Sequence, residues 1–302
     1  MRTLALSLAL AAAACEPFVR SDQASPDAGT PSFSVLDING FLVPPGSPIA
    51  VSGHPVATSP KFYLRKPSGP VPNCYYGVFV GDPSSAGQPN NGVLVSALGD
   101  MAKINGDPSL GGAGRTSCPD PATYAVGGGI PDGIKIGDEL SIAGFFEPYC
   151  DYYNTSAGQC QFDLFPEVTP NPPVGYSSGS VQDVHPGQPL APLVVDPTEI
   201  SDLATAAIQY AGELVEVQRV TVSNLPLDIY GDVVLDEGGL WLSALVPNVT
   251  IIDAPGTGFC SITGDLDFQF SHWKLRPRQQ SDLVLCPAGA DGKCDFSLCP
   301  AS

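Results

Sequence analysis

Short runs of apolar and β-branched residues, separated by turn-forming residues, constrain the fold of this chain more than any other feature. Residues 213–222 (ELVEVQRVTV) alternate apolar and polar side chains, which is typical of a β-strand with one buried face. Comparable runs recur from about residue 33 onward and are divided by turn formers such as Asn91-Gly92. Because the chain also contains 33 glycines and 32 prolines, long helices are not expected. The pattern predicts an all-β protein.

The β-like runs fall into two sets, and we interpret each set as a small β-barrel. The first set occupies residues 33–170 and the second occupies residues 198–286. Residues 171–197, which are rich in proline, glycine and serine, are predicted to be a linker. A capping-type start at Thr198 predicts one short helix between the barrels, ending near Tyr210.

One motif recurs in the two sets. Residues 136–145 (IGDELSIAGF) and 258–266 (GFCSITGDL) each run from alternating residues into a glycine, Gly144 in the first set and Gly264 in the second. A glycine at such a point lets a strand bend sharply at a barrel corner. The motif therefore suggests that the two sets are a degenerate repeat.

Residues 210–222 (YAGELVEVQRVTV) and residues 262–283, which include the run KLRPR, carry a resemblance to a known group of domains. They are similar to the OB-type domains appended to bacterial extracellular nucleases. The similarity covers residues 199–286 well and residues 33–170 loosely. It implies two tandem OB-like barrels and export from the cell. It brings no catalysis with it, because no remaining part of the chain is long enough to be the nuclease domain.

The first residues have the pattern of an export signal. Arg2 supplies a positive charge, and residues 3–14 (TLALSLALAAAA) are apolar or small, too short a run for a permanent membrane span. The run ends at Ala12-Ala13-Ala14-Cys15, which resembles the lipobox of bacterial lipoproteins, although Ala12 stands where leucine is commoner. The resemblance implies removal of residues 1–14 and attachment of lipid, including palmitate, to Cys15. The alternative is an ordinary secretory signal cut at A-x-A.

A lipid on Cys15 would make the membrane a partner of this chain. Residues 15–32 are polar and lack periodicity, so we interpret them as a flexible tether. Several acyl chains together hold a protein stably at a membrane, whereas one chain does not. By analogy with the sorting rule of some Gram-negative bacteria, Glu16 after the cysteine favours the outer membrane of the cell envelope.

The chain has nine cysteines, and a lipid on Cys15 would leave an even number for disulfides, as an oxidising compartment favours. Proximity in sequence predicts the pairs 74–118, 150–160, 260–286 and 294–299. The last pair lies in a cysteine-bearing tail, residues 287–302. Zinc is not expected, because no C-x-x-C pair occurs and the chain has three histidines. The candidate disulfide residues are Cys74, Cys118, Cys150, Cys160, Cys260, Cys286, Cys294 and Cys299.

Acidic residues outnumber basic ones by 31 to 13, which gives a formal net charge of −18. This charge argues against nucleic acid as a partner, since phosphate contacts rest on lysine and arginine. The densest basic stretch nevertheless offers Trp273, Lys274 and Arg276 as candidate ligand contacts. Alternation favours a different arrangement, in which Trp273 and Leu275 point inward while Lys274 and Arg276 point to solvent.

An aromatic loop offers a second candidate site. Tyr149, Tyr152 and Tyr153 lie beside Cys150 and Cys160, and a disulfide between these cysteines would hold the loop in one conformation. Because OB loops can bind oligosaccharides, a glycan or an envelope protein is a candidate partner of this loop. The alternative is that the tyrosines cover the end of the barrel.

The sequence contains no convincing catalytic centre. Residues 175–179 (GYSSG) match the pattern G-x-S-x-G, but a nucleophile elbow needs a strand before the serine and a helix after it. Prolines flank this stretch, so we interpret it as part of the linker. A catalytic role for Ser177 would require His54 or His185 within hydrogen-bond reach.

Carboxylates that could bind a metal ion are scattered, and none matches a dense calcium loop. Residues 290–295 (ADGKCD) leave a structural Ca²⁺ as an alternative to solvated loop acids. The other acidic candidates are Asp228, Asp232, Asp236, Asp265 and Asp267.

These features predict a non-catalytic cell-envelope lipoprotein that acts as a binding or structural module. The alternative is an accessory subunit of an extracellular nuclease, or a hydrolase with an unrecognised site.

Overall fold

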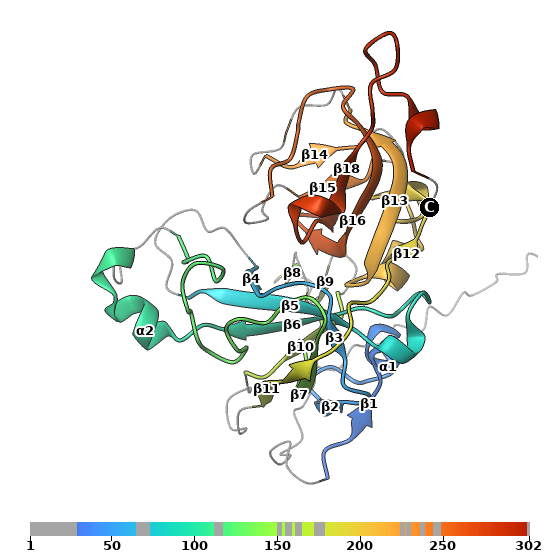
Figure 1. Ribbon diagram of the computed structural model, residues 1–302. Helices are drawn as coiled ribbons and strands as arrows, with labels where there is room; N and C mark the ends of the chain where they lie inside the picture. The colour runs from blue at the N-terminus through green and yellow to red at the C-terminus, as the bar shows by residue number, and fades with distance from the viewer. Residues whose placement is uncertain are drawn as a thin grey trace, which may run out of the picture.

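The computed structural model describes residues 29–64, 73–111, 117–149, 153–154, 159–160, 165–171, 179–223, 227, 231–235, 239–243 and 249–300 (Figure 1). Cys15, the export signal and most of the tether lie outside these residues. The described part is mostly β-structure, which confirms the predicted all-β class. None of its helices combines the length and apolarity that a membrane crossing requires. The helical elements are α1 (Val35–Asn39), η1 (Pro83–Ser85), α2 (Met101–Gly106), η2 (Pro108–Leu110), η4 (Pro197–Glu199), η5 (Ala207–Tyr210), η6 (Gln280–Asp282) and η7 (Phe296–Leu298).

A closed barrel of five strands, which we call the N-terminal barrel, forms the first half of the molecule. Around the ring the order is β3, β5, β6, β10, β7 and back to β3. The β6–β10 pair is parallel, and the other pairs are antiparallel. The five strands are β3 (Val56–Ala57), β5 (Tyr75–Gly81), β6 (Val93–Leu98), β7 (Asp138–Phe146) and β10 (Glu167–Thr169).

Further strands extend this barrel, and one of them corrects the predicted linker over residues 171–197. β11 (Ser180–Pro186) pairs antiparallel with β7 and satisfies the backbone groups along that strand. Its composition resembles that of a linker because most of its side chains face solvent, while Val181 is buried. β1 (Ser32–Phe33), β2 (Pro48–Val51) and β4 (Phe62–Tyr63) also join the sheet of the barrel. β8 (Tyr153–Asn154) and β9 (Gln159–Cys160) pair with each other in a separate two-stranded sheet.

The second half forms a seven-stranded sheet, which we call the C-terminal sheet (Figure 1). Its pairing runs from β14 through β15, β17 and β16 to β13, and the β15–β17 pair is parallel. An isolated antiparallel bridge between Val222 and Leu235 joins the ends of β13 and β14. The strands are β12 (Leu193–Val194), β13 (Leu214–Thr221), β14 (Val233–Val234), β15 (Trp241–Leu242), β16 (Gly258–Gln269), β17 (His272–Arg276) and β18 (Leu283–Leu285).

The two glycines of the sequence motif occupy matching places in these units. A Cβ atom on Gly144 of β7 would lie 2.5 Å from the carbonyl oxygen of Thr169. A Cβ atom on Gly264 of β16 would lie 2.7 Å from the carbonyl oxygen of Arg276. Each glycine therefore allows its strand to approach the backbone of the strand beside it, β10 or β17, more closely than any other residue could.

The short helix predicted between the units is wrong in its form. Pro197 begins the single 3₁₀ turn η4, capped by Asp196, and a second turn, η5, ends at Tyr210. Ile200 and Tyr210 are both buried. A helix of this length is marginal on its own, so packing of these side chains against the sheet decides the local conformation.

The N-terminal barrel and the C-terminal sheet share an apolar core across their contact. The core of the C-terminal sheet includes Phe62, Phe79 and Phe165 of the N-terminal barrel. A second core fills the inside of that barrel, around Val78 and Leu140. The two units therefore pack directly against each other.

A tight backbone contact accompanies this core, and we call it the seam (Asn39, Gly92, Ala211 and Gly212). The Asn39 amide Nδ2 donates to the carbonyl of Gly92 at 2.5 Å and to that of Ala211 at 2.8 Å. A Cβ atom on Gly92 would lie 2.1 Å from the carbonyl carbon of Gly212. Position 92 of the seam therefore requires glycine, because any side chain there would collide with the backbone of Gly212.

Candidate functional site

A cavity of about 640 Å³ lies between the N-terminal barrel and the β16–β17 hairpin of the C-terminal sheet. We call it the interface cavity. Small-molecule sites in proteins span roughly 300–1,000 Å³, so its size suits a small ligand. Its lining residues are Leu64, Tyr75, Leu94, Ser96, Tyr149, Phe165, Glu167, Asp267, Phe268, Gln269, Phe270 and Ser271.

Aromatic residues from both units form much of the wall. Tyr149 and Phe165 exchange two backbone hydrogen bonds of 2.8 and 2.9 Å, and the Phe165 ring lies 6.3 Å from that of Trp273. Tyr149, a predicted ligand contact, is half-buried and lines the cavity. Tyr152 and the side chain of Tyr153 lie outside the described residues.

Five polar residues also line the cavity: Ser96, Glu167, Asp267, Gln269 and Ser271. The Ser96 hydroxyl on β6 donates to the carboxylate of Glu167 on β10, so the parallel strand pair positions both groups. The Gln269 amide Nε2 donates to the Leu64 carbonyl at 3.0 Å, which ties the hairpin to the N-terminal barrel. Among the described lining residues none is basic. The cavity therefore offers aromatic faces, two carboxylates, an amide and hydroxyl groups.

The basic segment lies beneath this cavity, and its predicted arrangement is half right. Trp273 and Leu275 are buried in the core, as alternation predicts. The solvent exposure predicted for Lys274 and Arg276 is wrong, because their exposed fractions are 1% and 3%. The N-terminal barrel contacts Arg276, whose guanidinium lies 4.0 Å from the centre of the Phe62 ring. Lys274 instead lies against Asp232 and Phe270 of its own unit. All three candidate contacts are thus buried.

Each buried base has an acidic partner. Lys274 Nζ contacts the carboxylate of Asp232, and Arg276 Nη1 lies 3.4 Å from Asp267 Oδ2. Burial raises the pKa of Asp267, and the positive charge of Arg276 opposes that increase. Pairing is the usual condition for burying charge, so these bases are engaged within the protein.

Two other buried acids lie at the contact between the units. Asp265 has no exposed surface, and burial raises the pKa of its carboxyl to about 7 despite the nearby Arg278. Burial likewise raises the pKa of Glu213 beside the seam to about 8, opposed by a hydrogen bond from the Asn91 backbone. These carboxyls therefore favour their protonated form more than exposed acids do.

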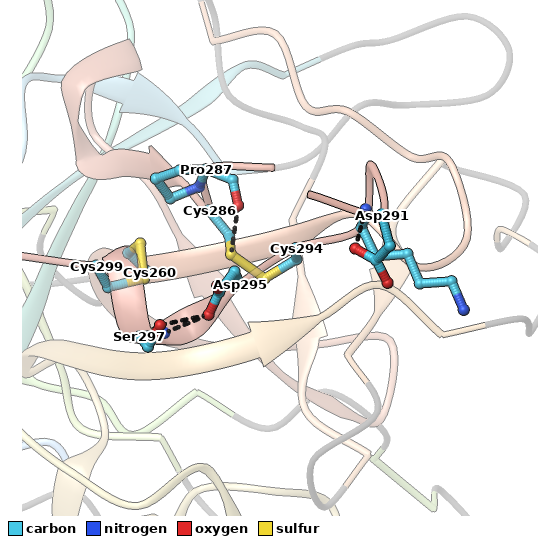
Figure 2. The surroundings of a disulfide bond; sticks show 9 residues. Cys260, Cys286, Pro287, Asp291, Cys294, Asp295, Ser297 and Cys299 are labelled. Atoms are coloured by element: carbon cyan, nitrogen blue, oxygen red, sulfur yellow. Dashed lines mark hydrogen bonds between the residues drawn. A yellow bond between two sulfur atoms is a disulfide. The ribbon is translucent and has the colours of Figure 1, made fainter. Parts of the chain in front are cut away.

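The cysteines confirm one predicted pair and correct two others. Cys74 bonds to Cys118, as predicted. Figure 2 shows the other two disulfides, Cys260–Cys299 and Cys286–Cys294, where 260–286 and 294–299 were predicted. Adjacency in sequence misleads here because the tail folds back along β16, bringing Cys299 to Cys260 across 39 residues.

The tail disulfides also bear on metal binding. The sulfur atoms of Cys260, Cys286 and Cys299 lie within 4.8 Å of one another. All three are oxidised, and a metal site would need thiolates instead. Cys150 lies outside the described residues, and of Cys160 the described part is its backbone in β9.

The remaining sequence candidates that the structure describes do not converge on one site, and Asp228 and Asp236 lie outside the described residues. Ser177 lies outside the described residues, and His54 is exposed. His185 lies on β11 and its Nε2 is 3.3 Å from Glu139. In the tail, Asp291 and Asp295 accept hydrogen bonds from backbone N–H groups two residues further on, which is their structural role in tight turns.

Sequence reasoning missed the hairpin tip, Phe268–Ser271, and Glu167. The tip has no glycine or asparagine, so it carries no turn signal. Comparison with protein-family models, curated proteins and solved structures gave no match to this chain. The geometry of the interface cavity is therefore the basis for assigning a function.

Proposed function

We propose that this protein is a non-catalytic binding module of the bacterial cell envelope that holds its ligand in the interface cavity. The observation that carries the proposal is the cavity itself, which both units line with aromatic and polar side chains. Apolar walls with a few convergent polar groups are the usual composition of a ligand site. A purely structural contact would bury these rings against each other, whereas Tyr75 remains 44% exposed.

We further propose that both units are OB-like. The strand order of the N-terminal barrel, numbered along the chain, is 1-2-3-5-4 with strands 3 and 5 parallel. The C-terminal sheet has the same order if the Val222–Leu235 bridge counts as the pairing of its first two strands. OB folds bind ligands on strands 2 and 3 and the adjoining loops. In the N-terminal barrel that face contributes Tyr75, Ser96 and Tyr149 to the cavity.

The proposed location is the outer membrane, with the chain exported and anchored through lipid on Cys15. Disulfides among the described residues support an oxidising compartment outside the cytoplasm. The expected partners are the membrane and a glycan or envelope protein, and the net charge of −18 disfavours nucleic acid. An intact mass of the protein from its native membrane tests the anchor. The expected mass lacks residues 1–14, includes lipid and rises by one hydrogen per bonded cysteine on reduction.

A cavity-filling variant tests the binding function. Ser96 is buried and lines the cavity, so Ser96→Trp should occupy the ligand volume. We expect at least one of four extracellular fractions (carbohydrate, peptide, lipid or nucleic acid) to raise the melting temperature of the wild type but not of Ser96→Trp. The control Ser84→Trp, at an exposed position, should respond like the wild type. The proposal fails if no fraction distinguishes the wild type from Ser96→Trp.

A hydrolase, or an accessory subunit of a nuclease, is the second candidate. Two carboxylates, Glu167 and Asp267, line the same cavity, and paired carboxylates serve glycoside hydrolysis. If the cavity is catalytic, a ligand that binds should also be cleaved, and Glu167→Gln should abolish cleavage while binding persists. Binding without any product favours the non-catalytic proposal.

A further inference from the structure

The tip of the β16–β17 hairpin has an unusual backbone for its residues. Gln269 pairs with His272, so Phe270 and Ser271 are the two residues of the turn. Their φ angles are 55° and 65°, both in the left-handed region. Turns of this type favour Asn-Gly, and a bulky aromatic residue there is a true outlier. Such strain concentrates at functional sites, so Phe270 is a candidate for a functional role.

The Phe270 side chain lies where a ligand can reach it. It lines the interface cavity and is half-buried, on the opposite unit from Tyr149. The ammonium of Lys274 lies 4.9 Å from the centre of the Phe270 ring and also pairs with Asp232. Asp232 already neutralises Lys274, so the Phe270 ring is not needed for that purpose. Phe270 is half-buried, so full burial of its side chain does not account for the strained turn.

The charges around the cavity select a ligand without net charge. Phosphates and other anions need basic contacts, and none of the described lining residues is basic. A cationic ligand stacked on Phe270 would share the ring with the ammonium of Lys274, and the two like charges would repel. The carboxylate of Asp267 already faces Arg276. A neutral ligand avoids both penalties.

The polar groups of the lining suit hydroxyls. Glu167 can accept hydrogen bonds at its carboxylate, and Gln269 presents a planar amide whose Nε2 already donates to Leu64. A pyranose ring has one face of C–H groups and a rim of hydroxyls that both donate and accept. The C–H face matches the negative face of an aromatic ring, and the rim matches a carboxylate and an amide.

We infer that the interface cavity takes a neutral oligosaccharide, with one sugar ring stacked on Phe270 and its hydroxyls bonded to Glu167 and Gln269. This inference rests on the proposed function, because it names the ligand class of the same cavity. The strained turn then has a function, because it holds the Phe270 ring where a sugar can stack on it.

The test measures binding of short neutral oligomers of glucose and of N-acetylglucosamine to the full chain by calorimetry. Oligomers of glucosamine and of glucuronate serve as the cationic and anionic counterparts. We expect one or both neutral series to bind and the charged counterparts to bind at least tenfold more weakly. Failure of both neutral series to bind overturns the inference.

Variants at the hairpin tip separate a ligand role from a structural one. Phe270→Asn should weaken binding about tenfold while the melting temperature stays the same or rises, because asparagine relieves the turn. Phe270→Tyr should retain binding. The matched control is Phe41→Asn, since Phe41 has the same φ of 55° and is not among the cavity residues. Its sugar affinity should equal that of the wild type. If Phe270→Asn keeps full affinity, the stacking arrangement is wrong.

The outcome also distinguishes this inference from the proposed function. If a peptide or lipid fraction stabilises the wild type but not Ser96→Trp, while no neutral oligosaccharide binds, the cavity is a ligand site of another class. If no fraction stabilises the wild type and no oligosaccharide binds, both proposals fail.

Discussion

The side-chain amide of Asn39 donates a hydrogen bond of 2.8 Å to the carbonyl of Ala211, 172 residues further along the chain. Asn39 ends α1 beside the N-terminal barrel, and Ala211 directly follows η5, three residues before β13 of the C-terminal sheet begins. The exposed fraction of Asn39 is 2%. This buried bond joins the two units to each other. Because both units line the interface cavity, it also helps to hold the cavity walls in place.

Removal of the Asn39 amide should loosen the seam. Asn39→Leu leaves the carbonyls of Gly92 and Ala211 without this donor, and an unsatisfied buried group costs about 1–3 kcal/mol. We expect urea unfolding to show a loss of that size. The control Gln88→Ala, at an exposed amide, should change stability by less than about 0.5 kcal/mol. Equal stability of the two variants would contradict this account of the seam.

The buried acids predict that stability falls as the pH rises. Burial holds the pKa of Asp265 at about 7 and that of Glu213 at about 8, above their ordinary values of 3.8 and 4.5. The folded state therefore binds these protons more tightly than the unfolded state does. The contribution of these two carboxyls to the unfolding free energy should be greatest below about pH 4, decrease between about pH 4 and pH 8, and level off above that range.

Amide variants check the origin of this pH dependence. Asp265→Asn and Glu213→Gln cannot ionise, so each should flatten the decrease measured by urea unfolding at several pH values. The cations Arg276 and Arg278 remain in both variants. The control Asp183→Asn, on exposed β11, should keep the wild-type slope. A double variant, Asp265→Asn with Glu213→Gln, that keeps the full slope would refute the assignment.

The close strand contacts predict that two glycines resist substitution. Gly144→Ala and Gly264→Ala would each place a Cβ atom within 2.7 Å of a backbone carbonyl oxygen. Relief requires the strands to separate, so we expect a loss above about 1 kcal/mol in each case. Gly106→Ala is the matched control, because its Cβ atom would meet open space. Thermal unfolding of the three variants gives the comparison, and a tolerated Gly264→Ala would rule out the close approach.

Because Lys274 and Asp232 form a buried ion pair, we expect their effects on the free energy of unfolding to be strongly coupled. Lys274→Met leaves the Asp232 carboxylate buried without its lysine, which typically costs about 3–5 kcal/mol. Replacing both residues, by Lys274→Met with Asp232→Leu, should recover most of the loss. Urea unfolding of the single and double variants measures the coupling energy. Lys293→Met, at an exposed lysine, should be nearly neutral, and a Lys274→Met variant as mild as this control would argue against a buried pair.

Part of the candidate site could be predicted from the sequence and part could not. Tyr149 stood out as one of three neighbouring tyrosines, and it does line the cavity. Phe270 gave no signal, because its importance comes from a left-handed backbone angle that its residue type disfavours. Glu167 is one acid among many until the parallel β6–β10 pair places it beside Ser96.

Local sequence patterns were enough to predict the all-β class and the strands that alternate clearly, because alternation of side chains between two faces is a local property of extended backbone. The alternating run over residues 213–222 contains β13 (Leu214–Thr221) for that reason. Contacts between segments distant in sequence set which polar faces are buried and which cysteines pair. Lys274 and Arg276 alternate as a solvent-facing pair would, yet both are buried, and the N-terminal barrel contacts Arg276 through Phe62. No local pattern encodes that contact, since it depends on segments about 200 residues apart, such as Tyr63 and Arg276.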